Sequence, residues 1–313
     1  MYSFIAKRLL ATIPVMGVVA VVIFLLLRLS PGDPAAVLAG DVGSPEDVRR
    51  IRVALGLDKP IHTQFVIWMG QLLRADLGMS IISNVPVTRM IRQRLEPTLA
   101  LATTTILFSV LVAVPLGVLA AWRHGIWVDR VVMVFSVLGF SVPVFVLGYL
   151  WIYGFAVSLK WLPVQGYVSI AQGFGPFFQR LILPTLTLSV IFIALIARIT
   201  RASVLEILGE DYIRTAYAKG VAERRLLIRH ALANAAVPIV TVIGISVALL
   251  IGGVVVTESV FNLPGLGRLT VEAVLARDYP IIQGLILIFS GVYVVLNLLI
   301  DIVYTLLDPR IRY

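Results

Sequence analysis

The sequence predicts an all-α polytopic membrane protein. Hydrophobic residues make up 59% of the 313 residues and charged residues only 14%, against roughly 45–50% and about 25% in an ordinary globular chain. Several apolar runs are long enough to cross a bilayer, because about 20 helical residues span roughly 30 Å of hydrocarbon. None shows the alternating pattern of a membrane barrel, so each run is expected to be a helix that satisfies its own backbone hydrogen bonds.

Six apolar runs are predicted to span the membrane. The first follows Lys7 and Arg8, but at about 21 residues it exceeds the apolar region of a secretory signal, so we expect an uncleaved anchor. Proline should kink the third and fourth spans, at Pro143 and Pro184. The predicted spans cover residues 9–29, 99–121, 131–158, 181–199, 237–257 and 281–306.

The distribution of basic residues predicts that both termini are cytoplasmic, because short cytoplasmic segments are rich in Lys and Arg. With that orientation the short outside loops carry Lys160, Arg180, Arg268 and Arg277. The cytoplasmic segments carry Lys7, Arg8, Arg123, Arg130, Arg198, Arg201, Arg214, Lys219, Arg224, Arg225, Arg229, Arg310 and Arg312. The same distribution accounts for the net charge of +9, so nucleic-acid binding is not expected.

The predicted organisation has three parts: an N-terminal segment with the first span (1–30), an extracytoplasmic cap region (31–97) and a core (98–313) with a cytoplasmic loop at 200–236. In the cap region a helix should start at Ser44-Pro45 and end at Gly56. Two further helical stretches carry Phe65, Trp68, Met69 and Leu72, then Met90, Ile91 and Leu95 before Pro97. Two interpretations stay open: the region docks a substrate-delivery protein or gates the outer mouth, or it simply covers the bundle.

The cytoplasmic loop is predicted to be a helix, a tight glycine turn and a second helix. Leu205, Leu208, Tyr212 and Ala216 recur at helical spacing, Gly220 ends the pattern, and a second helix opens at residues 222–223 with an acid at its positive end. Small residues before the turn would let the backbone of another protein come close. The loop is therefore a candidate docking element.

Residues 214–220 read Arg-Thr-Ala-Tyr-Ala-Lys-Gly. The stretch resembles the Glu-Ala-Ala-x-x-x-Gly loop of the transmembrane subunits of ATP-binding-cassette (ABC) importers, keeping the second Ala and the Gly and replacing the leading Glu by Arg214. Further segments look like landmarks of the dipeptide and oligopeptide branch: PGDP at 31–34, LGLDKP at 55–60, DLG at 76–78 with Ser80, SVPVF at 141–145, FNLPGLG at 261–267 and DPRIRY at 308–313. The resemblance covers nearly the whole chain.

The resemblance implies a type I ABC importer-like bundle in the bacterial plasma (inner) membrane. It implies transport of di- or oligopeptides, a heterodimer with a second homologous permease subunit, two cytoplasmic ATP-binding subunits and an extracytoplasmic substrate-binding protein. It also assigns ATPase coupling to ten positions of this loop: Arg214, Thr215, Ala216, Lys219, Gly220, Val221, Glu223, Arg224, Arg225 and Leu226.

The sequence offers no catalytic, cofactor or metal site. It contains neither a phosphate-binding Gly-x-x-x-x-Gly-Lys-Ser/Thr loop nor a His-Glu-x-x-His or Gly-x-Ser-x-Gly motif. There is no cysteine, and His62, His124 and His230 stand far apart. These absences agree with the resemblance, which implies a non-catalytic subunit whose partner subunits hydrolyse ATP.

Polar or helix-breaking residues in the spans are candidates for a pore or gate, although packing is the alternative for each. The candidates are Ser141, Pro143, Ser246, Phe261 and Asn297. The loop at 261–267 could plug the outer mouth or simply connect two spans. Asp301 is expected near the cytoplasmic end of the last span, hydrated or paired with an arginine such as Arg198, with a proton relay as the alternative.

Two alternative functions stay open. An ion-coupled secondary transporter would show paired broken helices in related halves and several buried ionisable groups, and neither is clear here. The same ABC machinery could also carry a nickel chelate, glutathione or another small solute.

Overall fold

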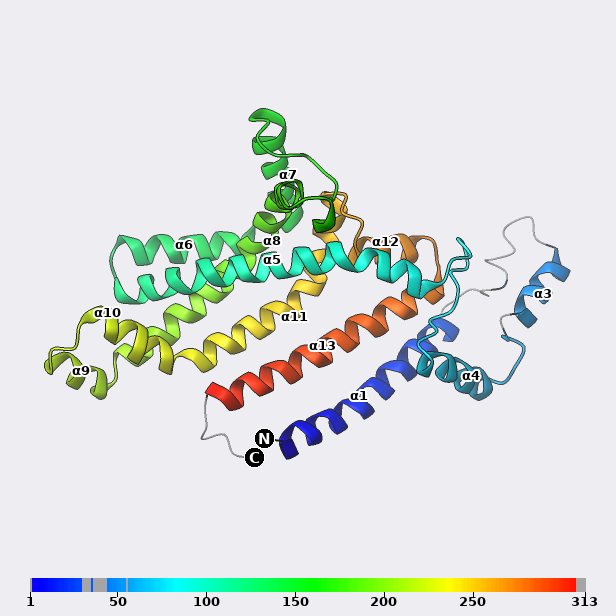
Figure 1. Ribbon diagram of the computed structural model, residues 1–313, viewed down its shortest axis with the longest axis horizontal. Coiled ribbons are helices and arrows are strands. Elements are labelled where there is room, and N and C mark those ends of the chain that lie inside the picture. Colours follow the sequence, from blue (N-terminus) through cyan, green and yellow to red (C-terminus); the bar gives the residue numbers. More distant parts are fainter. Residues whose placement is uncertain (1, 30–34, 36–43, 55, 308–313) are drawn as a thin grey trace. The chain divides into compact units, whose positions relative to one another are not determined.

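A computed structural model describes residues 2–29, 35, 44–54 and 56–307 (Figure 1). These residues form helices, turns and loops, with one isolated antiparallel bridge between Met79 and Pro86. The chain forms two compact units. The bundle unit comprises Met1–Ala6, Glu96–Arg268 and Tyr293–Tyr313, and the second unit comprises Lys7–Leu95 and Leu269–Val292.

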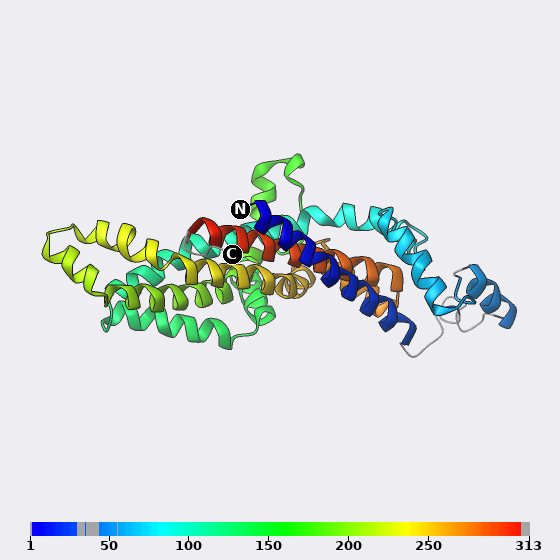
Figure 2. The ribbon, with the colours of Figure 1, turned by 90° about the horizontal axis from the view of Figure 1, so that it is seen from below.

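In the bundle unit one central helix, α8 (Phe174–Leu208), contacts most of the others. It is also the most buried of the long apolar helices, with 61% of its apolar window inside the protein. Both ribbon views show other helices of the unit beside it, at different angles (Figure 1, Figure 2). These neighbours are α5 (Val87–Trp122), which enters the unit at Glu96, α6 (Trp127–Ser141), α7 (Val144–Trp151) and α11 (Ala236–Val260).

Close approach to α8 depends on glycine. A Cβ at Gly117 of α5 would lie 2.6 Å from Cβ of Thr200, and a Cβ at Gly253 of α11 would lie 2.7 Å from Cδ1 of Leu188. Small residues allow backbones to approach in this way, which is how helices pack where lipid removes the hydrophobic driving force. The bundle unit is therefore built around α8 by close helix–helix packing.

The third predicted span, residues 131–158, is not one straight helix. Helix α6 ends at Ser141, α7 starts at Val144, and the two segments meet at 104°. Val142 adopts an extended conformation (ψ 123°), as expected for a residue that precedes a proline. Pro143 thus breaks the helix completely, where only a kink was expected. The second segment continues as a π-helix, η1 (Ile152–Ser158).

Proline has a different effect in α8, which runs without interruption through Pro184 from Phe174 to Leu208.

Four helices of the described chain are long and apolar enough to cross a membrane, and the bent α6–α7 pair makes a fifth if it counts as one span. The four are α5, α8, α11 and α13 (Tyr279–Leu307). In α1 (Tyr2–Leu29) the apolar stretch Leu10–Leu25 is shorter. The count of six spans stays a prediction.

The second unit confirms the predicted helix at Ser44–Gly56. Helix α3 covers Pro45–Ala54, and Gly56 follows it with φ +66°. The Leu57 N–H donates to the carbonyl of Arg52 at 2.9 Å, and the Gly56 N–H donates to that of Val53 at 3.0 Å. This is a Schellman cap, in which glycine takes the left-handed position at no steric cost.

The second predicted helix of this region is α4 (Ile61–Leu73). Its Phe65 and Trp68 rings pack on Phe24 of α1, with ring centroids 5.1 and 5.6 Å apart. Trp68 is thus a packing residue. The third stretch, with Met90, Ile91 and Leu95, is not a separate helix: it forms the start of α5, which continues through Pro97.

A buried aspartate organises the turn at residues 76–83 of the second unit. Asp278 is 2% exposed and accepts hydrogen bonds from the Ser80 hydroxyl (2.5 Å) and the Ile81 N–H (3.3 Å). Asp76 accepts from the N–H of Gly78 at 2.9 Å, and Gly78 has φ +81°. These contacts give a structural reason for the DLG-x-S landmark.

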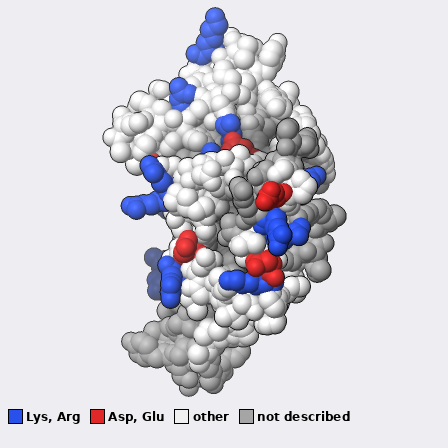
Figure 3. Space-filling view, turned by 90° about the vertical axis from the view of Figure 1, so that its right-hand side faces the viewer, with Lys and Arg blue, Asp and Glu red and all other residues white. Residues whose placement is uncertain are grey.

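In the view of Figure 3, the charged side chains form separate groups with uncharged surface between them, and some of these groups contain both signs of charge. The second unit has this mixture in its sequence: α3 combines Glu46 with Arg49 and Arg52. An ion pair also joins Arg94 of α5 to Glu272 of α12 (Leu266–Leu275) at 2.7 Å.

Candidate functional site

The connection between α8 and α11, residues 209–235, contains the predicted docking element. Helix α8 ends at Leu208, and α9 (Asp211–Ala218) begins after Glu210, whose backbone is extended. Asp211 lies in the first turn of α9, where an acid favours the positive end of the helix dipole. The uninterrupted helical spacing predicted from Leu205 to Ala216 is therefore broken at residues 209–210, but the helix before the glycine turn is confirmed.

One side of α9 is buried and the rest is exposed. Ile213 is 4% exposed and anchors the helix, whereas Tyr212 and Tyr217 are 44% and 67% exposed. The exposed side also carries Arg214, which pairs only with Asp211 one turn earlier at 3.4 Å, together with Thr215, Ala218 and Lys219. A short helix that presents aromatic and basic groups to its surroundings has the features of a protein-docking surface.

Gly220 makes the turn that the sequence predicts. Its φ is +76°. The Val221 N–H donates to the carbonyl of Ala216 at 3.2 Å, and the Gly220 N–H donates to that of Tyr217 at 2.9 Å. This is again a Schellman cap, so glycine is needed for its backbone conformation. A Cβ at Gly220 would contact nothing within 4 Å, which leaves the outer side of the turn open to another protein.

After the turn the chain returns to the bundle through α10 (Glu223–Arg225) and a π-helix, η3 (Leu226–Leu232). Glu223, Arg224 and Arg225 are exposed, while Leu226 and Leu227 are 5% and 8% exposed. Ala231 belongs to a small hydrophobic cluster with Ala121, Val204, Ala235 and Ile239. A groove of about 740 Å³ lies between this return segment and the end of α5, lined mostly by apolar side chains and by Glu223 and Arg224.

The structure places the candidate pore or gate residues at separate points, and two of the five, Ser246 and Phe261, are buried. Ser246 is fully buried and donates to the carbonyl of Val242, one turn earlier in α11. Phe261 is 1% exposed and belongs to the main hydrophobic core. Asn297 of α13 donates to the carbonyl of Tyr293. Ser141 and Pro143 lie together at the break between α6 and α7.

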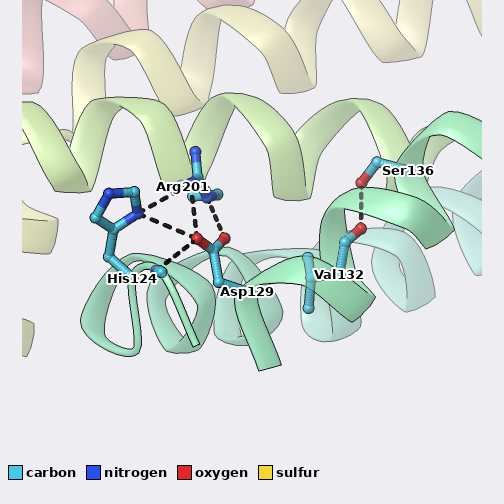
Figure 4. Close-up of polar contacts among 6 residues, drawn as sticks. His124, Asp129, Val132, Ser136 and Arg201 are labelled. Atoms are coloured by element: carbon cyan, nitrogen blue, oxygen red, sulfur yellow. Dashed lines mark hydrogen bonds and ion pairs between the residues drawn. The ribbon is translucent and has the colours of Figure 1, made fainter. Parts of the chain in front are cut away.

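A polar cluster that the sequence analysis missed joins two helices and a turn (Figure 4). The Asp129 carboxylate accepts two hydrogen bonds from the guanidinium of Arg201, from Nε at 2.5 Å and from Nη2 at 2.8 Å. The Gly125 N–H donates to the same carboxylate at 3.0 Å, and Nδ1 of His124 lies 3.1 Å from it. Asp129 is 4% exposed, so α6, α8 and the α5–α6 turn meet at one buried charge.

A second missed cluster surrounds Glu258 near the end of α11. Glu258 is fully buried; it accepts from the hydroxyl of Thr98 at 2.6 Å and from the N–H of Arg268 at 2.9 Å. The Leu266 N–H donates to Oγ1 of Thr98 at 2.8 Å. A Cβ at Gly265 would lie 2.1 Å from Oε1 of Glu258. The loop at 261–267, which leads into α12, thus folds around the Glu258 carboxylate.

A loop of the bundle unit is attached to α5 by Glu96. Its carboxylate accepts hydrogen bonds from the hydroxyls of Ser169 (2.7 Å) and Tyr167 (3.0 Å) and from the N–H of Ile170 (3.1 Å). Burial, and then the hydrogen bond to Glu96, raise the pKa of Tyr167 above its usual value. The phenol therefore remains a neutral hydrogen-bond donor at physiological pH.

Neither missed carboxylate had a visible partner in the sequence. Asp129 and Arg201 are 72 residues apart, and Thr98 and Glu258 are 160 apart. Asp129 does carry one local signal, because it lies in the first turn of a helix after a His-Gly turn. The guanidinium of Arg198, which was considered as a partner for Asp301, lies 5.5 Å from the ring centroid of Phe140, and the role of Asp301 stays a prediction.

Comparison with known proteins identifies the family. Residues 113–313 match the model of the binding-protein-dependent transport system inner membrane component, and residues 1–102 match the model of its N-terminal region. A Sinorhizobium fredii protein named as a peptide ABC transporter permease is 58% identical, with 99% of both chains aligned. A Brucella abortus protein named as a peptide transport system permease is 46% identical, with 100% of both chains aligned.

Two further matches extend this comparison. The glutathione transport system permease of Salmonella typhi is 43% identical, with 100% of both chains aligned. A structure of the inward-facing methionine ABC transporter MetNI covers 71% of this chain and 97% of its own, with a TM-score of 0.57 and 18% identity, which shows a shared fold. The chain therefore belongs to the family of binding-protein-dependent transport system inner membrane components and is a multi-pass permease subunit of an ABC importer in the inner membrane.

Proposed function

We propose that this permease carries di- or oligopeptides that an extracytoplasmic binding protein delivers. The observation that carries the proposal is full-length similarity to permeases named for peptide transport, at 58% and 46% identity. The 43% identical relative named for glutathione transport fits the same class of solute, because glutathione is itself a tripeptide. A nickel chelate or another small solute is the alternative cargo.

The permease works as a heterodimer with a second homologous subunit and two cytoplasmic ATP-binding subunits, which hydrolyse the ATP. Only 6% of the apolar window of α13 is buried within this chain, which supports a surface covered by lipid or by a second membrane subunit. The chain has six spans with both termini cytoplasmic. Residues 31–97 form the extracytoplasmic cap, and residues 98–313 form the core that carries the cytoplasmic loop at 200–236.

The connection 209–235 couples ATP hydrolysis to transport by seating α9 and the Gly220 turn on an ATP-binding subunit. Three features support this role: the open space outside Gly220, the exposed Tyr217 and Lys219, and the buried Ile213 and Leu226 that attach the segment to its own chain. The contact surface comprises Arg214, Thr215, Ala216, Lys219, Gly220, Val221, Glu223, Arg224 and Arg225, with Leu226 as an anchor beneath it.

The break at Ser141 and Pro143 is the strongest of the candidate gates, because there the chain turns by 104°.

The test is a matched pair of glycine substitutions. Gly220→Trp and Gly56→Trp each replace the left-handed glycine of a Schellman cap at a position with open space. Both variants are expected to insert into the membrane. Only Gly220→Trp should lose co-purification with the ATP-binding subunits and peptide uptake by proteoliposomes that also contain the binding protein. Uptake and association that stay normal in Gly220→Trp would refute the coupling assignment.

A separate measurement tests the cargo. Proteoliposomes with the complete importer are loaded with ATP and offered labelled di-, tri- and hexapeptides, glutathione and a nickel chelate. We expect uptake of at least one α-linked peptide to depend on ATP and on the binding protein. Uptake of the nickel chelate alone would replace the peptide proposal.

A further inference from the structure

Two buried charges lie where α8 approaches the end of the bundle. The Asp129 side chain is 6% exposed and that of Arg201 is 17% exposed, and the two hydrogen bonds between them use both carboxylate oxygens. A two-point contact of this kind fixes the angle between the groups as well as their distance. Because a buried ion pair stabilises a protein little compared with packed apolar residues, its fixed geometry is the property that calls for an explanation.

Thr200, the residue before Arg201 in α8, is held by α5. Thr200 is fully buried, and a Cβ at Gly117 of α5 would lie 2.6 Å from its Cβ and 2.7 Å from the carbonyl oxygen of Ala197. Two successive residues of α8 are therefore held by different helices: Thr200 by α5 and Arg201 by α6. We call these two contacts, Gly117–Thr200 and Asp129–Arg201, the α8 clamp.

Along α8, the α8 clamp lies between residues of two hydrophobic clusters. Ile196 and Ala197, just before the clamp, belong to the main core. Val204, just after it, belongs to the smaller cluster that contains Ala231 and Ala235 of the connection 209–235. Arg201 also lies only about 10 Å of helix before Leu208, at roughly 1.5 Å per residue. Along α8, a displacement of α9 therefore reaches the clamp before the main core; Val114 of α5 and Ile243 of α11 contact both clusters as well.

We propose that Asp129 and Arg201 are positioning residues for energy coupling: their ion pair makes α5, α6 and α8 move as one body when an ATP-binding subunit displaces the connection 209–235. This inference rests on the proposed coupling role of that connection. Without the pair, the end of α8 and the segment packed on it move alone. ATP hydrolysis then continues while less solute is transported for each ATP.

The test uses the complete importer in proteoliposomes and measures peptide uptake and ATP hydrolysis in the same sample. In Asp129→Asn, which preserves size and removes the charge, we expect the ratio of uptake to hydrolysis to fall about fivefold or more, with ATP hydrolysis and subunit association retained. The control is Arg94→Gln, which breaks another arginine–carboxylate pair at 2.7 Å in the second unit. An unchanged ratio in Asp129→Asn, or an equal fall in Arg94→Gln, would overturn the inference.

Two further variants separate a positioning role from general damage. Arg201→Lys keeps the charge and loses the two-point geometry, so its ratio should also fall; a wild-type ratio would show that geometry is irrelevant. Asp129→Asn combined with Arg201→Gln should have no larger effect than either change alone, because the pair acts as a unit, and additive losses would argue against it. Gly220→Trp distinguishes the two proposals, because it should abolish association with the ATP-binding subunits, whereas the Asp129 variants should retain it.

Discussion

The bundle unit holds two buried carboxylates, and their partners differ in kind. Asp129 accepts two hydrogen bonds from a charged side chain, the guanidinium of Arg201. Glu258 accepts from the Thr98 hydroxyl and from the backbone N–H of Arg268, and there is no room beside it for a Cβ at Gly265. Along α5, about 36 Å of helix separates Thr98, which contacts Glu258, from Trp122, which precedes the turn that leads to Asp129.

The difference teaches which contact can be removed without disturbing the local backbone. A side-chain ion pair can be removed by substitution while α6 and α8 keep their own backbone hydrogen bonds, so loss of the Asp129–Arg201 pair should release the two helices from each other and leave each one intact. The Glu258 cluster ties the start of α12 to the end of α11 through backbone hydrogen bonds and close contact at Gly265. We therefore expect the Glu258 cluster to affect mainly stability and the Asp129 cluster mainly coupling.

The largest effect on stability is expected for Glu258→Ala. The change leaves the Thr98 hydroxyl and the Arg268 N–H without this acceptor inside the protein, and unsatisfied buried groups cost about 1–3 kcal/mol each. The unfolding free energy in detergent should fall by about 3 kcal/mol. Glu258→Gln, which keeps one acceptor oxygen, should lose less. Equal stability of the wild type and Glu258→Ala would remove the structural role assigned to this carboxylate.

Gly265→Ala should have the next largest effect. Its Cβ would lie 2.1 Å from Oε1 of Glu258, so the loop or the carboxylate has to move, at a cost of about 1–3 kcal/mol. The control is Gly252→Ala in α11, where a Cβ meets nothing within 4 Å and alanine favours the helix. Thermal unfolding of the two variants measures the contrast, and equal melting temperatures would contradict the close packing around Glu258.

A smaller effect on stability is expected when the whole Asp129–Arg201 pair is replaced. In Asp129→Leu combined with Arg201→Met, no charge remains unpaired, and the stability should stay within about 1 kcal/mol of the wild type. The ratio of uptake to ATP hydrolysis should nevertheless remain low. A variant that is stable and fully coupled would show that the pair has no part in energy transfer.

The smallest effect on stability is expected on the exposed face of α9. The Arg214 and Asp211 side chains are 75% and 95% exposed, so Arg214→Ala should change the unfolding free energy by no more than about 0.5 kcal/mol. Binding of the ATP-binding subunits should weaken all the same, because Arg214 belongs to the proposed contact surface. Unchanged binding at low and high salt would exclude a role for this charge in docking.

Local rules predicted much of the candidate site and of the fold. The turns at Gly56 and Gly220 were predicted because a helix end needs one residue in the left-handed region, and the structure has a Schellman cap at both. The break at Pro143 was predicted only as a kink. Its angle of 104° was not predictable from proline alone, since α7 is also held by contacts such as those of Gly148 with Val260 and Phe261.

The sequence by itself determined that this chain is a helical membrane protein, where most of its helices lie and which turn the connection 209–235 makes. These properties follow from apolar length and from backbone preferences within a few residues. Only the tertiary structure decided that Asp129 meets Arg201 and that Ser80 meets Asp278, across 72 and 198 residues of chain. Such pairs depend on how distant elements pack within each unit, and no local pattern specifies which distant group reaches which partner.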